Sequence, residues 1–139
     1  MMIDSPLAML EAGRAFASSL NGGELVTLSG GLGAGKTLFC KGVLEGLGYQ
    51  GDVLSPTFNI INHYAPPDTQ LPVIHADLYR LNSPDELKEL GMFDSADADT
   101  VSLVEWPEQG GQAFACARFR ISIAVKDENT RTLTIEENV

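Results

Sequence analysis

Residues 30–37 carry the clearest chemistry in the sequence. They read Gly-Gly-Leu-Gly-Ala-Gly-Lys-Thr and match the pattern G-x-x-x-x-G-K-[ST] of phosphate-binding loops. In such a loop, glycines let the backbone curl so that several N–H groups point at phosphate oxygens, beside the positive N-terminus of the next helix. We therefore expect the backbone of Gly33, Ala34 and Gly35 to bind a nucleotide.

Lys36 and Thr37 are the two side chains that give this loop its specificity. The lysine is expected to lie across the β- and γ-phosphates as a positive charge, and the threonine hydroxyl to bind Mg²⁺. At this chain's content of glycine, lysine, serine and threonine, an accidental match has a probability on the order of one in two hundred. The loop therefore predicts a nucleoside triphosphate bound with magnesium.

Two acids, Asp77 and Glu105, each follow a run of four mostly apolar residues, 73–76 and 101–104. Such runs are typical of buried strands, and α/β sheets place ligands at the carboxyl ends of their strands. Hydrolysis of a bound nucleotide needs an acid in the magnesium shell and a group that orients the attacking water. The spacing places both acids at the edge of the loop but leaves open which takes which role.

Thr57 and Trp106 are further candidates, each with a structural alternative. Thr57 lies in a Ser-Pro-Thr-Phe segment after the helix that follows the loop, where many hydrolases of this kind sense the γ-phosphate. It can reach Mg²⁺ or its water, or it can belong to a turn that begins a strand. Trp106 and Pro107 form either a rigid lid over the site or an aromatic plug that ends the strand, and we favour the plug.

Arginine, histidine and cysteine give fewer candidates. Arg80 or Arg131 can stabilise transferred phosphate charge, although surface pairing is the preferred interpretation for each. His75 is interpreted as a packed, hydrogen-bonded residue. Cys40 and Cys116 lack metal-ligand spacing and are expected to be reduced thiols in or near the core.

Hydrophobic periodicity and capping residues predict the elements that position these side chains. We expect a helix from Ser5 to the Asn-Gly-Gly segment at residues 21–23, a helix after the loop and a helix from Ser83 to Gly91. Strands are expected near residues 25–28, 58–64, 73–76, 101–104, 119–125 and 130–135. The last two strands alternate as a hairpin does. This order predicts a single α/β domain over residues 1–139, a three-layer fold of the phosphate-loop NTPase type with a mainly parallel sheet and a C-terminal antiparallel hairpin.

Composition narrows the classes of partner. The 139 residues are 44% hydrophobic and carry a formal net charge of −10, which repels a phosphate backbone. We expect no tight direct nucleic-acid binding by the chain alone. The sequence contains no apolar run of membrane-spanning length and begins without a signal-peptide pattern, so we expect a cytoplasmic protein without a membrane partner.

Four blocks, GGLGAGKT, SPTF, HADLYR and LVEWPE, occur in this order between residues 30 and 108. Together they resemble the TsaE (YjeE) family of bacterial ATPases. The resemblance implies a weak ATPase that works with ATP and Mg²⁺ in the biosynthesis of threonylcarbamoyladenosine in tRNA, in a complex with TsaB-like and TsaD-like proteins.

Carried over by position, the resemblance implies that Thr37 and Glu105 are the magnesium ligands and that Asp77 is the acid needed for hydrolysis. Thr57 and Trp106 belong to the same active region. Catalytic roles are therefore expected for Asp77, Lys36 and Thr57.

Further positions near the nucleotide are implied in the same way. Arg131 lies where a family arginine near the final hairpin approaches the nucleotide. Leu38 stands where the family has a second threonine near the α-phosphate, and Gly31 where it has aspartate. These two departures bear on rate and affinity, since Lys36 and Thr37 are intact.

Two other classes of function share the loop. A small-molecule kinase would pass phosphate to a bound acceptor, but five scattered arginines give little sign of an acceptor site. A nucleotide-dependent switch would bind without useful turnover. The Asn-Lys-x-Asp segment that reads guanine in Ras-like switches is absent from the sequence, which favours adenine.

Overall fold

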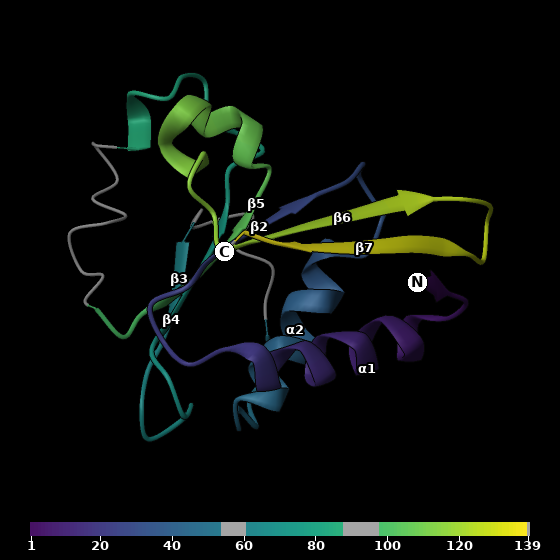
Figure 1. The fold of residues 1–139 in the computed structure, drawn as a ribbon, viewed down its shortest axis with the longest axis horizontal. Coiled ribbons are helices and arrows are strands. Elements are labelled where there is room, and N and C mark those ends of the chain that lie inside the picture. The colour runs from purple at the N-terminus through teal and green to yellow at the C-terminus, as the bar shows by residue number, and fades with distance from the viewer. Residues whose placement is uncertain (54–60, 88–97, 139) are drawn as a thin grey trace.

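The computed structural model describes residues 1–53, 61–87 and 98–138. Its centre is a seven-stranded sheet in the order β1-β7-β6-β2-β5-β4-β3 (Figure 1). The strands are β1 (Met2–Ile3), β2 (Leu25–Ser29), β3 (Ile61–Tyr64), β4 (Val73–Asp77), β5 (Val101–Glu105), β6 (Phe119–Val125) and β7 (Arg131–Glu137). The helices are α1 (Pro6–Phe16) and α2 (Lys36–Gly46), with 3₁₀ helices η1 (Ala17–Ser19) and η2 (Pro107–Phe114).

The sheet is parallel in its middle and antiparallel at both edges. Strand β2 pairs in parallel with β5 and β6, and β5 with β4. The antiparallel pairs are β3 with β4, β6 with β7, and β1 with β7. The predicted α/β fold and its C-terminal hairpin are confirmed, and the sheet is mixed rather than mainly parallel. The connections after β3 and β6 are too short to contain a crossover helix, so each following strand returns antiparallel.

Side chains that alternate along the strands build two hydrophobic clusters. Val26 and Leu28 of β2 belong to the larger cluster, with the buried residues of α1 and α2. Ile74 and Val104 point to the other face and pack with Phe114 of η2. Because successive residues of a strand face opposite sides of a sheet, the two clusters form separate layers above and below it. Figure 1 shows α1 and α2 on one side and η2 on the other.

Helix α1 begins and packs as its sequence predicts. The Ser5 side chain accepts a hydrogen bond from the Ala8 N–H at 3.0 Å, and proline occupies the first helical position. Met9, Gly13 and Phe16 form its buried face. The helix ends at Phe16 and continues as the 3₁₀ turn η1 before the Asn-Gly-Gly segment that was expected to stop it.

Two predicted elements are described only in part. The strand expected over residues 58–64 is seen from Ile61 onward. The helix expected from Ser83 is seen in Glu86 and Leu87, whose N–H groups donate to the carbonyls of Ser83 and Pro84. Its expected end at Gly91 lies outside the described residues. Within the described ranges, none of the helices is long and apolar enough to cross a membrane.

Helices α1 and α2 approach each other through glycines. A Cβ atom on Gly13 would collide with the Phe39 carbonyl oxygen, and one on Gly42 with the Leu10 carbonyl oxygen. The Cα atom of each glycine also lies 3.0 Å from where the other's Cβ would stand. Only glycine permits such backbone contact. Because α2 begins at the end of the phosphate-binding loop, this contact helps to fix the loop's position.

We predict that Gly42→Ala destabilises the protein by about 1–3 kcal/mol, because overpacking forces the two backbones apart. Alanine's better helix propensity, about 1 kcal/mol, offsets part of this cost. Urea unfolding followed by circular dichroism measures the change. The control is Gly31→Ala, whose added Cβ meets nothing within 4 Å and should change stability by less than about 0.5 kcal/mol. Equal stability of the two variants would contradict the close contact.

Candidate nucleotide-binding site

The loop between β2 and α2 has the backbone that a phosphate site requires. Gly35 caps α2 with a φ of +112°, and Gly33 has a φ of +76°. Both angles lie in the left-handed region that glycine adopts without strain. The Ala34 N–H donates to the Gly31 carbonyl at 3.1 Å, which closes a turn inside the loop. The predicted order of buried strand, glycine loop and helix N-terminus is confirmed.

The Lys36 ammonium group lies inside this loop. Its side chain donates hydrogen bonds to the carbonyl oxygens of Gly30 and, at 3.3 Å, of Gly31. The Trp106 ring centroid is 3.9 Å from Nζ, a cation–π contact. Burial lowers the pKa of Lys36, and the negative charges of Glu105 and Asp77 oppose that shift. The amine is thus held in place by neutral carbonyls and an aromatic face, with two acids nearby.

Glu105 is the last residue of β5, is 2% exposed and links three elements through its carboxylate. Thr37 of α2 donates its hydroxyl hydrogen toward the carboxylate, with Oγ1 at 3.1 Å from each oxygen. His75 of β4 has Nε2 at 2.6 Å from Oε2. The sequence predicted a packed, hydrogen-bonded His75, and this is confirmed, although its partner was not foreseen.

Asp77 lies beside Glu105 at the same sheet edge, as predicted. The two residues are Cα partners in the parallel pairing of β4 and β5. Asp77 Oδ1 accepts a hydrogen bond from the Tyr79 N–H at 3.0 Å. Burial raises the pKa of Asp77, and the negative charge of Glu105 adds to the increase. A carboxyl group with a raised pKa is suited to accept a proton from water.

Trp106 combines the two roles that the sequence left open. Its ring packs against the second hydrophobic cluster and also lines the pocket that holds Lys36. The Tyr79 ring lies 4.9 Å away, centroid to centroid. Trp106 also has a φ of +58°, the one positive φ among the described residues other than glycine. This costly backbone conformation turns the chain directly after Glu105.

A pocket of about 310 Å³ gathers the predicted groups. It is lined by the loop from Gly31 to Leu38 together with Asp77, Glu105 and Trp106. Residues from three distant parts of the sequence, expected from spacing alone to share one sheet edge, therefore line one pocket. Thr57, also predicted here, lies outside the described residues.

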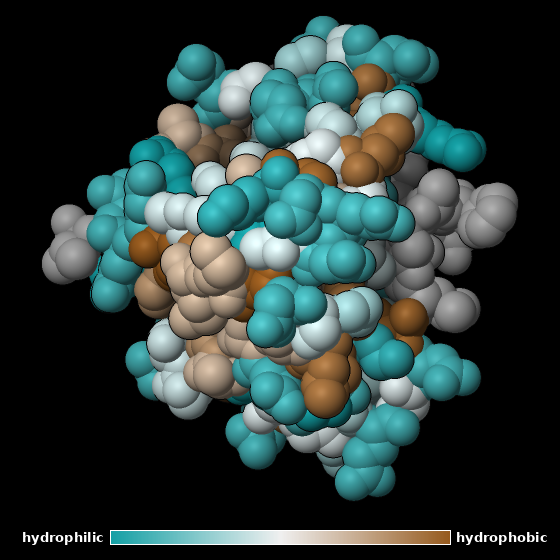
Figure 2. Space-filling model, turned by 90° about the vertical axis from the view of Figure 1, so that its right-hand side faces the viewer, coloured by the Kyte–Doolittle hydropathy of each residue, from teal (hydrophilic) through white to brown (hydrophobic). Residues whose placement is uncertain are grey.

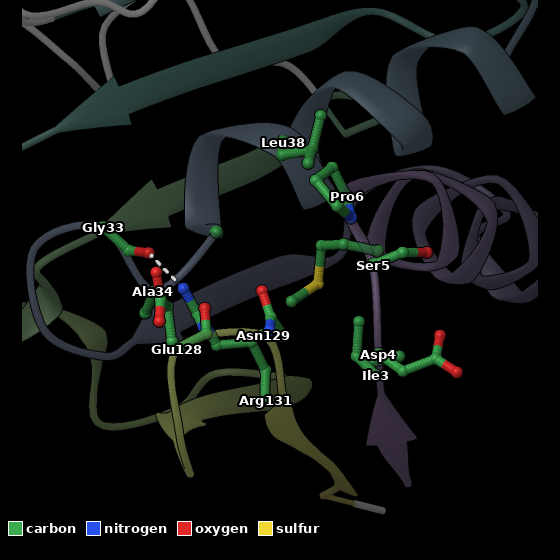
Figure 3. A pocket seen from close by; sticks show the side chains of 12 residues that line it. Ile3, Asp4, Ser5, Pro6, Gly33, Ala34, Leu38, Glu128, Asn129 and Arg131 are labelled. Carbon is green, nitrogen blue, oxygen red and sulfur yellow. Dashed lines mark hydrogen bonds between the residues drawn. The ribbon is translucent and has the colours of Figure 1, made fainter.

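A second pocket of about 320 Å³ lies beside the first and shares part of the loop and Leu38 with it (Figure 3). Its other walls come from the N-terminal segment and from the hairpin: Ile3, Asp4, Ser5, Pro6 and Met9, and Glu128, Asn129 and Arg131. Of these eight residues, only Arg131 was predicted from the sequence to lie near the nucleotide. The others are polar or apolar residues without a motif, and the fold brings them together from opposite ends of the chain.

Arg131 connects the hairpin to the loop, with Nη2 at 3.4 Å from the Gly33 carbonyl oxygen. Nη1 donates to the carbonyls of Asp127 and Thr130 in the hairpin turn, at 3.0 and 3.2 Å. Its pairing is with backbone oxygens rather than with a surface acid. Arg80, the alternative candidate, is exposed and lines neither pocket.

Cys40 is buried beneath the site, whereas Cys116 is exposed, so the expectation of two core thiols is wrong for Cys116. Possible ligand atoms of Cys40, His75 and Glu105 lie within 4.8 Å of one another. Burial raises the pKa of Cys40 well above its ordinary value, which disfavours the thiolate that a metal needs. The 2.6 Å between His75 and Glu105 is a hydrogen-bond distance. We interpret the cluster as a buried polar network.

Comparison with known proteins places this chain in a family. Residues 3–133 match the model of "Threonylcarbamoyl adenosine biosynthesis protein TsaE". A Haemophilus influenzae protein named tRNA threonylcarbamoyladenosine biosynthesis protein TsaE is 36% identical over 131 residues, covering 91% of this chain and 82% of its own. The protein of that name from Streptomyces coelicolor is 42% identical over 116 residues, covering 83% and 78%.

The fold agrees with this assignment. The crystal structure of YdiB from Bacillus subtilis superimposes with a TM-score of 0.78 at 31% sequence identity, covering 99% of this chain and 83% of that one. The matched residues 3–133 include the whole of β2, β4 and β5, which carry the loop, Asp77 and Glu105. The chain therefore belongs to the TsaE family.

Proposed function

We propose that this protein binds ATP with Mg²⁺ and hydrolyses it as a subunit of the machinery that makes threonylcarbamoyladenosine in tRNA. The observation that carries the proposal is the convergence of Lys36, Thr37, Asp77 and Glu105 on one pocket. The relatives are named for the biosynthesis of threonylcarbamoyladenosine in tRNA, which supports the proposed pathway, and the residues of the pocket support the ATP chemistry.

Phosphate binding is assigned to the loop and Lys36. The N-terminus of α2 and the glycine-rich backbone favour an anion at this place. The Lys36 ammonium group, now bonded to the Gly30 and Gly31 carbonyls, needs only to exchange these acceptors for phosphate oxygens. The Trp106 ring, 3.9 Å from Lys36 Nζ, limits movement of the ammonium group away from the loop.

The donor set fits Mg²⁺, which prefers hard oxygen ligands and keeps several waters. Thr37 supplies a hydroxyl and Glu105 a carboxylate, already 3.1 Å apart at the pocket wall. Bound there, the ion would neutralise charge on the phosphates. We assign Asp77 to the attacking water, because its raised pKa and half-buried position suit a group that accepts a proton. By resemblance, Thr57 assists in the same region.

The neighbouring pocket is assigned to the nucleoside. It adjoins the phosphate loop at Gly33, Ala34 and Gly35, as a base and ribose attached to the phosphates require. Pro6 and Leu38 give it an apolar side, and Asn129 and Arg131 a polar one (Figure 3). Such a mixture of apolar walls and few polar groups is typical of small-molecule sites. We assign adenine on the absence of a guanine-reading motif from the sequence.

TsaB-like and TsaD-like proteins are the proposed partners, with turnover that is weak until they are present. A chain of net charge −10 is unsuited to hold tRNA by itself, so contact with tRNA is assigned to the partners. The face around the N-terminus and the hairpin turn is mostly hydrophilic, with hydrophobic residues in separate patches (Figure 2).

We predict that Lys36→Ala lowers the affinity for a fluorescent ATP analogue by about 10- to 100-fold, because charge-assisted hydrogen bonds to phosphate are lost. In a reconstituted reaction with the partner proteins, the same variant should not support tRNA modification. The control is Lys41→Ala, which removes the same charge from the same helix at a position that lines neither pocket. Full modification with Lys36→Ala would refute the proposed role.

We predict that Asp77→Asn binds the ATP analogue normally but hydrolyses ATP at least about 100-fold more slowly, because the proton acceptor is lost. It should also be more stable than wild type at neutral pH without metal. The raised pKa of Asp77 means that folding disfavours its charged form, so stability is lost as the pH rises through that pKa. Thermal unfolding should show that the stability difference between the variant and wild type becomes smaller at acidic pH. Turnover of the variant at the wild-type rate would exclude Asp77 as the proton acceptor.

A further inference from the structure

The two oxygens of Glu105 have different surroundings. Oε2 lies 2.6 Å from His75 Nε2, while both oxygens lie 3.1 Å from the Thr37 hydroxyl. His75 is fully buried, and its Nδ1 has no hydrogen-bond partner among the described residues. The arrangement therefore fits an imidazole whose proton is on Nε2 and is donated to Oε2. Oε2 is therefore held by histidine as well as approached by Thr37, whereas Oε1 has only the Thr37 hydroxyl, which is itself a proposed magnesium ligand.

We propose that His75 is a positioning residue that restricts Glu105 to one-oxygen coordination and so makes the site select Mg²⁺ over Ca²⁺. This inference rests on the proposed function, in which Glu105 is a magnesium ligand. Mg²⁺ requires near-octahedral geometry with short bonds, whereas Ca²⁺ accepts six to eight oxygens and often takes both oxygens of a carboxylate. A carboxylate that has one oxygen hydrogen-bonded to His75 therefore suits Mg²⁺ better than Ca²⁺.

The fold gives His75 little freedom to release that oxygen. It lies in β4, which is paired on both sides, with β3 at Asn62 and with β5 at Leu103. Its side chain is 0% exposed. A ring held by two neighbouring strands and a packed core keeps its Nε2 at one place while ligands exchange in the pocket. Residues that orient a metal ligand in this way usually change metal affinity about 10- to 100-fold when they are lost.

Three substitutions separate the hydrogen bond from the packing. His75→Gln keeps an N–H donor near the position of Nε2, His75→Asn carries its donor at the shorter reach of Nδ1, and His75→Leu has no donor. The matched control is His63→Leu, because His63 is the other histidine of the chain and lies exposed on β3. Thermal unfolding establishes which variants fold.

Binding of a fluorescent ATP analogue is titrated with Mg²⁺, with Ca²⁺ and in excess EDTA. We expect the affinity in EDTA to be unchanged in every folded variant. The half-saturating Mg²⁺ concentration should rise about 10- to 100-fold in His75→Leu and His75→Asn, while that of Ca²⁺ changes less. In His75→Gln the half-saturating Mg²⁺ concentration should lie close to the wild-type value, and in His63→Leu it should equal that value. A packing defect alone should weaken the binding of both ions to a similar extent, so a loss confined mainly to Mg²⁺ points to the hydrogen bond.

A wild-type measurement covers the case in which the variants fail to fold. In the ¹⁵N spectrum of histidine-labelled protein, the buried Nε2–H of His75 should give a slowly exchanging signal that persists when Mg²⁺ and the ATP analogue are added. The inference would be overturned if this signal were lost on adding Mg²⁺. It would also be overturned if His75→Leu had the same half-saturating concentrations of Mg²⁺ and of Ca²⁺ as wild type. Wild-type protein that binds no nucleotide in any condition would instead overturn the proposed function.

Discussion

The buried carboxylate of Glu105 is the feature on which the rest of the site depends. The Glu105 side chain is only 3% exposed, and a charged group is costly to bury unless hydrogen bonds compensate its lost hydration. Here the Thr37 hydroxyl and the His75 imidazole provide them. Because these partners belong to α2 and β4, the need to satisfy one charge ties a helix and two strands together at the sheet edge where the loop opens.

The close packing of α1 on α2 extends this constraint to the nucleoside pocket. The glycine contact at Gly13 and Gly42 sets the distance between the helices, so the start of α1 reaches the loop. Arg131 approaches the loop from the opposite side and bonds the Gly33 carbonyl. Both ends of the chain are thereby brought to one glycine-rich turn. The pocket in Figure 3 is a consequence of packing and needs no motif of its own.

The phosphate-binding loop has a sequence motif and the second pocket has none, which explains why the sequence predicted only the first. The loop, Asp77 and Glu105 were predictable because each is fixed by local backbone geometry and by the common carboxyl edge of neighbouring parallel strands. The antiparallel edge strand β3 and the partner of His75 depend on contacts between distant residues, which periodicity does not encode. Cys116 is exposed because it lies in the link between η2 and β6. The residue type alone does not tell a cysteine in such a link from one in the core.

The charges of the site, taken together, favour metal and nucleotide binding as a pair. Burial lowers the pKa of Lys36 and raises that of Asp77, so both groups are held in an environment that disfavours their charged forms. A bare triphosphate would place further negative charge beside Asp77 and Glu105, with Lys36 as the one cation among the pocket's lining residues. A divalent ion alone would meet two acids and a lysine. Under the proposed function, each ligand supplies the charge that makes the other's site favourable, so the two should bind cooperatively.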